Sequence, residues 1–251
     1  MQLAAAIVLS TLVGISLGLL GGGGSILAVP VLVYAGGVTP HAAIGMSLAI
    51  VGTTSLFAGL IHGRSGNVAW RLVVPFGLFG LGASYLGARA TRGVSPALLL
   101  VLFGSVMVVA GALMLRGRRE AESSGRQQPR VLALVPVAIG LGLLTGSLGV
   151  GGGFLVVPAL VLFGGLPMRL AVGTSLFVIA VNSAAGFLAH LSDHDLDVLR
   201  TITFTAAALV GAIAGQRLAG RVSPRTLRTA FGALVVILGI VLLSKNLAIL
   251  L

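Results

Sequence analysis

Two glycine-rich segments interrupt long apolar stretches of the chain, and their backbone could bind an anion without any charged side chain. The first reads Gly21-Gly22-Gly23-Gly24 and the second Gly149-Val150-Gly151-Gly152-Gly153. A helix that starts after such a break, at Ser25 or Phe154, has N–H groups without intrahelical partners and a positive dipole end. Helix starts of this kind favour anions, and glycine lets a ligand approach the backbone closely. We therefore predict substrate binding at Gly22, Gly23, Gly24, Ser25, Gly151, Gly152 and Gly153.

Other interpretations of the glycine segments exist. Small residues also line the interfaces between membrane helices, so close packing is the structural alternative. A dinucleotide-binding loop is a weaker candidate, because neither segment fits G-x-G-x-x-G and no βαβ pattern surrounds it.

Hydroxyl and amide side chains follow each break on the next apolar block. The segments Ala-Ile-Gly-Met-Ser-Leu (43–48) and Ala-Val-Gly-Thr-Ser-Leu (171–176) place Ser47 and Ser175 at equivalent positions, and Asn182 lies further along. Such groups can donate to an oxyanion without the cost of a buried charge. Alternatively, Ser and Thr donate to carbonyls of their own helix. We predict Ser47, Ser175 and Asn182 as further substrate ligands, whereas back-bonding is at least as good an account of Thr53 and Thr54.

His62 and His190 each end the second apolar block of a half of the chain. A titratable side chain at a membrane helix end could guard an entrance or move a proton, so both are candidate gate or proton-linked residues. The favoured alternative is a helix C-terminal cap, where partial positive charge suits the dipole. No third ligand type stands at a suitable spacing, so no metal site is predicted.

The acidic residues Asp193, Asp195 and Asp197 cluster in one short segment, which is best interpreted as a solvated turn. No Asp or Glu lies inside any apolar block, so a proton relay built on buried carboxylates is not available. The chain also lacks a Ser/His/Asp or paired-carboxylate constellation. We therefore predict a protein that is not an enzyme and that needs no cofactor.

The composition is that of a membrane protein. Hydrophobic residues make up 57% of the 251 residues, charged residues only 8%, and the mean hydropathy is +1.13. Soluble domains carry about 25% charged residues. The apolar runs are continuous and approach the roughly 20 residues of a membrane-spanning helix, unlike the short alternating segments of a β-barrel. The net charge of +11 comes from Arg at the ends of these runs and in one polar stretch, which is typical of membrane topology signals rather than of nucleic-acid binding. Cysteine is absent, which excludes disulfides.

An internal repeat organises the chain. Pro158 follows Pro30 by 128 residues, and with this offset residues 14–115 align without a gap on residues 142–243. Matched pairs include His62/His190, Arg89/Arg217 and the two Ser-Pro dipeptides at 95–96 and 223–224, which shared apolar composition does not explain. We predict a first transmembrane repeat (1–115), a charged cytoplasmic linker (116–130) and a second transmembrane repeat (131–251).

Each half contains a glycine-broken first block followed by three apolar blocks, which in the first half are 42–62, 70–90 and 96–115. We interpret the first block as two half-helices, re-entrant or paired, which makes the two halves inverted. With inverted halves, twelve Lys and Arg residues lie on the linker side of the membrane and four on the opposite side. With parallel halves, nine lie on the linker side and seven on the opposite side. The positive-inside rule therefore favours inversion with both termini outside, although Arg89 and Arg92 then lie on the outer side. The predicted fold class is an all-α polytopic membrane protein with two homologous, inverted repeats.

The segments LLGGGGSILAVP and SLGVGGGFLVVP, each followed by Gly-Gly, by AIGMSL or AVGTSL, and by a helix that ends in His, resemble the sulfite exporter TauE/SafE family of permeases. The resemblance covers both repeats and essentially all of the chain outside the linker. It implies a transporter of sulfite, sulfoacetate or related sulfur-containing anions, with Gly23, Gly24, Gly151, Gly152, Ser47 and Ser175 at recurring family positions. The first break departs from the second, with Gly22 in place of Val150 and Ser25 in place of Gly153.

We therefore expect a secondary transporter that moves a small anion, such as sulfite or an organosulfonate, by alternating access between the two breaks. A passive anion channel and a non-transporting membrane scaffold are the alternatives. The expected location is the bacterial inner (plasma) membrane, in a multi-pass arrangement. The expected partners are the anionic substrate and the lipid bilayer, with no nucleic acid, and glycine-rich faces could support a homodimer.

Overall fold

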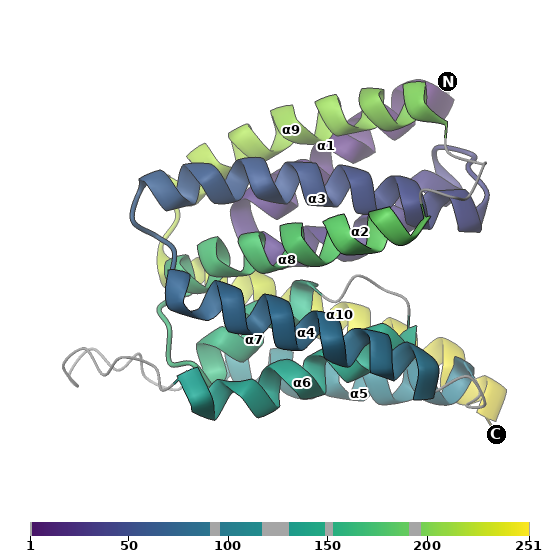
Figure 1. Cartoon of the computed structure of the whole chain (residues 1–251). Helices are drawn as coiled ribbons and strands as arrows, with labels where there is room; N and C mark the ends of the chain where they lie inside the picture. Colours follow the sequence, from purple (N-terminus) through teal and green to yellow (C-terminus); the bar gives the residue numbers. More distant parts are fainter. Residues whose placement is uncertain (1, 91–95, 117–130, 149–152, 191–196, 251) are drawn as a thin grey trace.

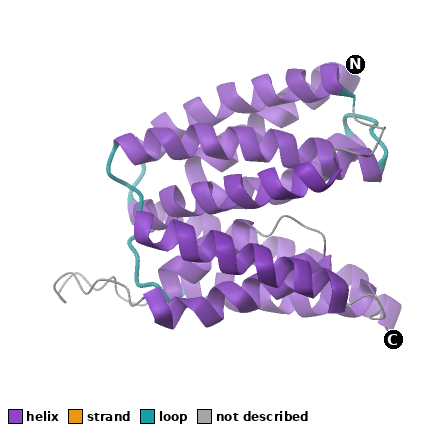
Figure 2. Ribbon diagram, in the orientation of Figure 1, coloured by secondary structure: helices purple, strands orange, loops and turns teal. Residues whose placement is uncertain are grey.

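The structure, a computed structural model, describes residues 2–90, 96–116, 131–148, 153–190 and 197–250. Every element within these ranges is helical (Figure 2). The first half contains α1 (Gln2–Leu20), the 3-10 turn η1 (Gly21–Gly24), α2 (Ser25–Tyr34), α3 (Pro40–Arg64), α4 (Trp70–Ala90) and α5 (Pro96–Leu115). The second half contains α6 (Val131–Leu148), α7 (Gly153–Leu162), α8 (Met168–His190), α9 (Val198–Arg221) and α10 (Pro224–Leu250). The predicted all-α fold is confirmed, and the bounds of α4 and α5 match the predicted blocks.

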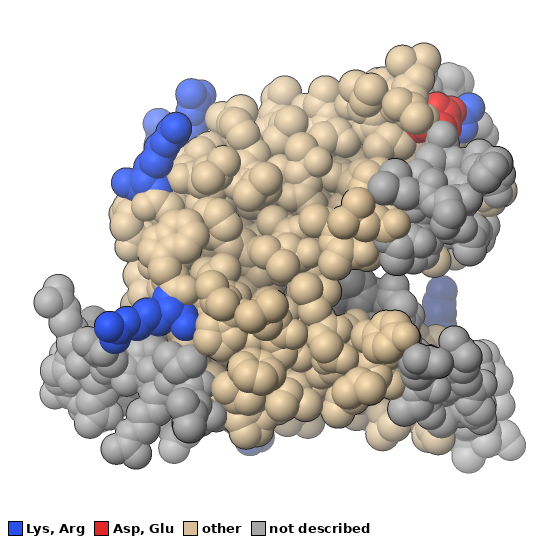
Figure 3. Space-filling view, in the orientation of Figure 1, with Lys and Arg blue, Asp and Glu red and all other residues tan. Residues whose placement is uncertain are grey.

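Five segments of the described residues are long and apolar enough to cross a membrane. They are Ala6–Tyr34, Ala42–Arg64, Met168–Leu188, Val198–Arg221 and Pro224–Lys245. Large apolar side chains such as Leu78, Leu188 and Leu199 are exposed on the outside of the bundle. A broad belt without Lys, Arg, Asp or Glu crosses the visible face of the molecule (Figure 3). Most of the basic side chains on this face lie beyond the belt, at the left-hand end. A surface of this kind suits lipid rather than water.

The first apolar block folds back on itself at the four glycines. Gly21 has a φ of +69°, a left-handed conformation that glycine adopts without strain. After the turn, Gly24 lies so close to α1 that a Cβ there would be 2.6 Å from the Leu17 backbone nitrogen. Further along α2, Ala28 packs with Val13 and Leu17. α1 and α2 therefore form a tight antiparallel pair, and the predicted interruption of this block is present.

The second glycine break falls outside the described residues, because the structure does not describe 149–152. It describes α6 up to Leu148 and α7 from Gly153. The ends of the half-helices α2 and α7 are alike. Gly37 and Gly165, which the repeat relates, both have a φ of +62° just after the helix ends.

Close helix contacts between the halves involve residues that the repeat makes equivalent. A Cβ on Gly14 of α1 would collide with the Ala208 backbone of α9, and one on Gly142 of α6 would lie 2.5 Å from the Gly80 carbonyl oxygen of α4. With the 128-residue offset, Gly14 is equivalent to Gly142, and Gly80 is equivalent to Ala208. The same packing arrangement therefore occurs twice, once on each side of the molecule.

α5 and α10, which are also equivalent in the repeat, run antiparallel to one another. Gly104 of α5 packs against Gly239 of α10, and Gly111 packs against Gly232. The Ser-Pro dipeptide at 223–224 starts α10, because the Thr226 amide donates to the Ser223 hydroxyl over 3.1 Å and Pro224 is the first residue of the helix. In Figure 1, α1 begins and α10 ends at the same end of the bundle, and α5 ends and α6 begins at the opposite end. We refer to this second end as the linker end.

Candidate functional site

The first glycine break lies inside the molecule, against the second half. All four glycines of η1 are buried. A Cβ on Gly21 would lie 3.0 Å from the Ser175 hydroxyl oxygen and 3.1 Å from a methyl carbon of Val172 on α8. A Cβ on Gly23 would lie 3.1 Å from the Phe231 ring of α10. The break of one half therefore meets the Ala-Val-Gly-Thr-Ser-Leu segment of the other half.

The donors of Ser25 are already used within the break. Its backbone N–H donates to the Gly22 carbonyl, and its hydroxyl donates to the same oxygen over 2.7 Å. The expectation that α2 starts with an unpaired amide at Ser25 is therefore wrong in this conformation, because the 3-10 turn supplies an acceptor that an isolated helix start would lack. The amides of Gly22, Gly23 and Gly24 stay predicted ligands, but a 3-10 turn pairs amides with carbonyls three residues earlier, so the turn must open before they can donate to an anion.

The predicted hydroxyl ligands are placed alike in the two halves. Ser47 is 6% exposed and Ser175 is fully buried, and each hydroxyl donates over 2.8 Å to the carbonyl three residues earlier, on Ile44 or Val172. This is the back-bonding alternative, and it leaves each hydroxyl oxygen able to accept. Asn182 lies two turns beyond Ser175 on α8, beside Gly80 of α4, and its buried side-chain oxygen has no hydrogen-bond partner within the described residues.

The remaining predicted residues of the second half are only partly visible. Gly151 and Gly152 lie outside the described residues. Gly153 is the first residue of α7, and α7 packs against η1. His190 is the last residue of α8, and its side chain lies outside the described part of the chain.

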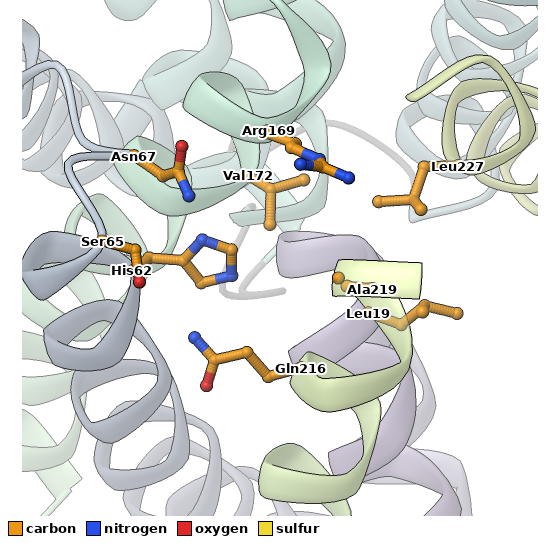
Figure 4. Close-up of a pocket in the computed structure, with 10 residues that line it drawn as sticks. Leu19, His62, Ser65, Asn67, Arg169, Val172, Gln216, Ala219 and Leu227 are labelled. Atoms are coloured by element: carbon orange, nitrogen blue, oxygen red, sulfur yellow. The ribbon is translucent and has the colours of Figure 1, made fainter. Parts of the chain in front are cut away.

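A cavity of about 130 Å³ opens next to the first break, at the linker end. Its polar lining comes from His62, Ser65 and Asn67 at and after the end of α3, from Arg169 on α8 and from Gln216 on α9. In Figure 4 the imidazole of His62 points into the cavity, and the amide of Gln216 faces it from α9. Val172 lines the cavity and also contacts Gly21, so the cavity and the break share a wall.

His62 does not cap its helix. The backbone caps α3 instead, because Gly66 takes a φ of +70° and the Asn67 amide donates over 2.9 Å to the His62 carbonyl. The Ser65 hydroxyl donates to the Ile61 carbonyl over 3.1 Å. The imidazole of His62 is 7% exposed, and neither of its ring nitrogens has a partner within the described residues. The favoured capping interpretation of this histidine is therefore wrong.

Two residues of the Ala-Val-Gly-Thr-Ser-Leu segment position the cavity. A Cβ on Gly173 would overlap the Asn67 carbonyl oxygen, so only glycine lets α8 lie this close to the loop after α3. The next residue, Thr174, accepts a hydrogen bond from the Ala69 amide over 2.9 Å and donates to the Leu170 carbonyl over 2.6 Å. Together they hold the 65–69 loop, and with it Asn67, against α8.

Comparison with known proteins identifies the family. The family model described as sulfite exporter TauE/SafE matches residues 6–242. The chain belongs to the sulfite exporter TauE/SafE family. It is also 39% identical over 243 residues to a probable membrane transporter protein of Xylella fastidiosa, covering 94% of this chain and 92% of the relative. No solved structure matches.

Relatives of lower identity carry similar names. The chain is 25% identical to the probable membrane transporter protein YdhB of Bacillus subtilis, with coverage of 92% of this chain and 96% of the relative. It is also 25% identical to the probable membrane transporter protein MJ0441 of Methanocaldococcus jannaschii, with coverage of 94% of each chain. Together with the apolar helices, these matches make the protein a multi-pass membrane transporter.

Sequence analysis missed Asn67, Arg169, Thr174 and Gln216 of this TauE/SafE transporter. Weak signals existed for two of them. Thr174 is the polar exception in a repeated segment that has Met46 at the equivalent position, and Gln216 is a lone amide in an apolar helix.

Asp197 is the one carboxylate in the described ranges, and it lies at the start of α9, where it pairs with Arg200 over 3.1 Å. Within those ranges, no carboxylate therefore neutralises the basic side of the cavity.

Proposed function

We propose that this TauE/SafE transporter is a secondary carrier of a small anion, with sulfite or an organosulfonate as the substrate class. Its site lies between the two glycine breaks, and access alternates between the two halves. The family supports transport of a sulfur oxyanion, and the apolar interior without carboxylates in the described ranges favours an anionic rather than a cationic cargo. The broken-helix arrangement is a recurrent solution in secondary transporters.

The observation that carries this proposal is the contact between Gly21 and Ser175. The break of the first half lies against the polar segment of the second half, so closely that a Cβ on Gly21 would lie 3.0 Å from the Ser175 hydroxyl oxygen. In this conformation the two halves are in direct contact there, so a ligand that opens this junction would touch both halves at once. Its affinity therefore depends on their relative arrangement, which is the physical requirement for alternating access.

The proposed ligands are the backbone amides of both breaks together with nearby polar side chains. They comprise Gly22, Gly23, Gly24, Gly151, Gly152 and Gly153, with Ser47, Ser175 and Asn182 as side-chain ligands. The oxygen of Asn182, unpartnered within the described residues, and the full burial of Ser175 support a polar interior between the halves. Rotation of either serine hydroxyl away from its own helix would free its proton for an oxyanion.

The proposed topology is an inverted pair of repeats in a bacterial inner membrane, with the linker in the cytoplasm. Two observations support it. The equivalent helices α5 and α10 run antiparallel, and basic side chains gather at the linker end. Positive residues favour the cytoplasmic side. A cysteine placed in the linker and labelled from only one side of intact cells would test this orientation.

The function is tested with purified protein in liposomes. Saturable sulfite or methanesulfonate uptake, with counterflow when the same anion is loaded inside, supports a carrier. Flux that does not saturate with anion concentration indicates a channel. If the folded protein carries no flux of any anion, the protein is a non-transporting scaffold. Either of the last two results overturns the proposal.

The site within the carrier is tested with Gly23→Ala. The nearest neighbours of the added methyl group would be the side chains of Phe231 and Leu234, at 3.1 and 3.4 Å, so the protein can fold with a small adjustment. We expect sulfite uptake to fall at least tenfold, because the methyl group hinders approach to the amides. Gly82→Ala is the matched control, since no atom of the described residues lies within 4 Å of its new methyl group. Equal uptake by the two variants would contradict the site.

A further inference from the structure

We propose that the cavity between His62, Arg169 and Gln216 is a second anion subsite, which holds the oxyanion at the linker end before or after it reaches the glycine break. This inference rests on the proposed function, since it assumes that an anion moves through the molecule. The subsite is distinct from the break, because its polar groups come from side chains at the ends of α3, α8 and α9.

His62 is the strongest indication of a ligand in this cavity. It is 7% exposed, and both ring nitrogens lack a partner within the described residues. A buried polar group without a hydrogen bond is costly, and such groups in a folded protein need an explanation. The ring points into the cavity rather than into the core (Figure 4). An oxyanion there would accept a hydrogen bond from the imidazole N–H.

Arg169 supplies the charge. Its side chain lines the cavity, and within the described residues its guanidinium makes one long hydrogen bond, of 3.5 Å, to the Val222 carbonyl. A guanidinium has five N–H donors and suits oxyanions, which it can bind through two parallel hydrogen bonds. The one carboxylate in the described ranges, Asp197, pairs with Arg200 instead. Among the described residues, most donors of Arg169 are therefore left for a ligand, and no carboxylate there pairs with its charge.

Two amides complete the polar lining. The Gln216 side chain reaches from α9 and makes a long contact of 3.4 Å with the Ala58 carbonyl. Asn67 lies across the cavity, on the loop that Thr174 and Gly173 hold in place. These neutral groups can donate to an anion without adding charge, so the site combines one cation with several weaker donors.

The cavity suits a compact ligand in its size and lining. Its volume of about 130 Å³ is ample for one compact anion with a few water molecules. The apolar side chains of Leu19, Val172 and Leu227 line the rest of the wall. The subsite therefore suits a compact oxyanion head group, such as sulfite or methanesulfonate, with an apolar wall beside it.

The cavity also adjoins the break directly. Leu19 lies two residues before Gly21, and Val172 touches both the cavity and Gly21. Val172 therefore separates an anion in the cavity from the junction of Gly21 and Ser175. Two adjacent subsites along one route are consistent with a transported anion rather than with a permanently bound one.

The subsite is tested by calorimetric titration of purified protein in detergent with sodium sulfite and with sodium methanesulfonate. Arg169→Gln removes the charge but keeps two donors, and its side chain is exposed, so this variant should fold. We expect its affinity for sulfite to fall at least tenfold. His62→Leu should lower the affinity several-fold. Arg225→Gln, which removes an exposed charge at the start of α10 outside the cavity lining, should bind within twofold of the wild type.

The flux assay separates this inference from the proposed function. If wild-type liposomes show saturable sulfite uptake, but Arg169→Gln and His62→Leu bind and transport sulfite like Arg225→Gln, the subsite is overturned and the carrier stands. If wild-type protein shows no flux but binds sulfite through Arg169 and His62, the subsite stands and the carrier is overturned. If wild-type protein neither binds nor transports sulfite or methanesulfonate, both are overturned.

Discussion

The two halves of this transporter share a scaffold but differ in the residues that could contact an anion. At the scaffold level, Ser47 and Ser175 are equivalent in sequence, are both buried, and donate in the same way to their own helices. At the neighbouring position the halves diverge, since Met46 stands where the second half has Thr174. Only the second segment can therefore hold a loop through a side-chain hydroxyl at this position.

The contrast extends to the polar lining of the cavity. The repeat offset of 128 residues pairs each cavity residue with an equivalent position in the other half of the sequence. Where the linker end has Arg169, Asn67, Ser65 and Gln216, the equivalent positions carry His41, Asp195, Asp193 and Ala88. In the sequence, the guanidinium and the neutral polar groups of the cavity thus correspond to a histidine, two carboxylates and an alanine. Among the described residues the repeat preserves the helix packing, whereas the residue types at these positions differ between the halves.

The largest expected effect comes from filling the space that lets α8 approach the 65–69 loop. Gly173→Ala would place a methyl group on the Asn67 carbonyl oxygen, so the helix and the loop must move apart. We expect a loss of about 3 kcal/mol in the free energy of unfolding, at the upper end for overpacking. Thermal unfolding in detergent measures it, with Gly82→Ala as the control that should leave the melting temperature unchanged or slightly higher. An unchanged melting temperature for Gly173→Ala would show that the loop is not held here.

The second prediction replaces Thr174 by an apolar residue, because the first half has the apolar Met46 at the equivalent position. Thr174→Val removes the acceptor of the Ala69 amide without a large change in volume. An amide left without its partner destabilises the fold by about 2 kcal/mol, and sulfite affinity should fall because Asn67 is no longer positioned. Thr203→Val is the matched control, since the Thr203 hydroxyl bonds back to the Leu199 carbonyl of its own helix. If the two variants unfold at the same temperature, Thr174 has no special role.

A matched pair of glycines isolates the contact between the halves. Gly21 and Gly66 share a left-handed backbone conformation, with φ angles of +69° and +70°. A Cβ on Gly66 would have no atom of the described residues within 4 Å, whereas a Cβ on Gly21 would meet Ser175 and Val172. Gly66→Ala should cost about 1 kcal/mol of stability, from the left-handed conformation alone. Gly21→Ala should cost more, and Ser175→Ala in the same chain should recover part of the difference. Equal costs in chemical denaturation would remove the evidence that the break is packed against α8.

The smallest effects on stability are expected at the two serines. Ser47→Ala and Ser175→Ala each delete a hydroxyl that bonds back to its own helix, so stability should change by less than about 0.5 kcal/mol. Sulfite uptake should nevertheless fall in both variants if both hydroxyls contact the substrate. Uptake equal to the wild type in both, with protein of normal melting temperature, would remove the serines from the site.

Sequence analysis could predict the helices and the first break because these follow from local properties. Continuous apolar runs indicate spanning helices, and four successive glycines weaken a helix wherever it lies. Gly21 and the Ser223 cap are features of this local kind. The cavity is different, because Arg169 and Gln216 look like ordinary helix residues until α8 and α9 are placed beside the end of α3. His62 was singled out by its type, but its role depends on Gly66, which caps the helix and leaves the imidazole unused.

The glycine contacts between α5 and α10 have a consequence for how such a chain could have originated. Gly104 meets Gly239 and Gly111 meets Gly232, and the repeat relates Gly104 to Gly232 and Gly111 to Gly239. In each contact, one of two repeat-equivalent glycine positions on α5 therefore meets the other position on α10. Residues in the symmetric interface of a homodimer pair in the same way. A shorter ancestral chain with a single such helix would already have carried both sides of the contact. Joining two copies would then have fixed their pairing and left each copy free to acquire its own side chains.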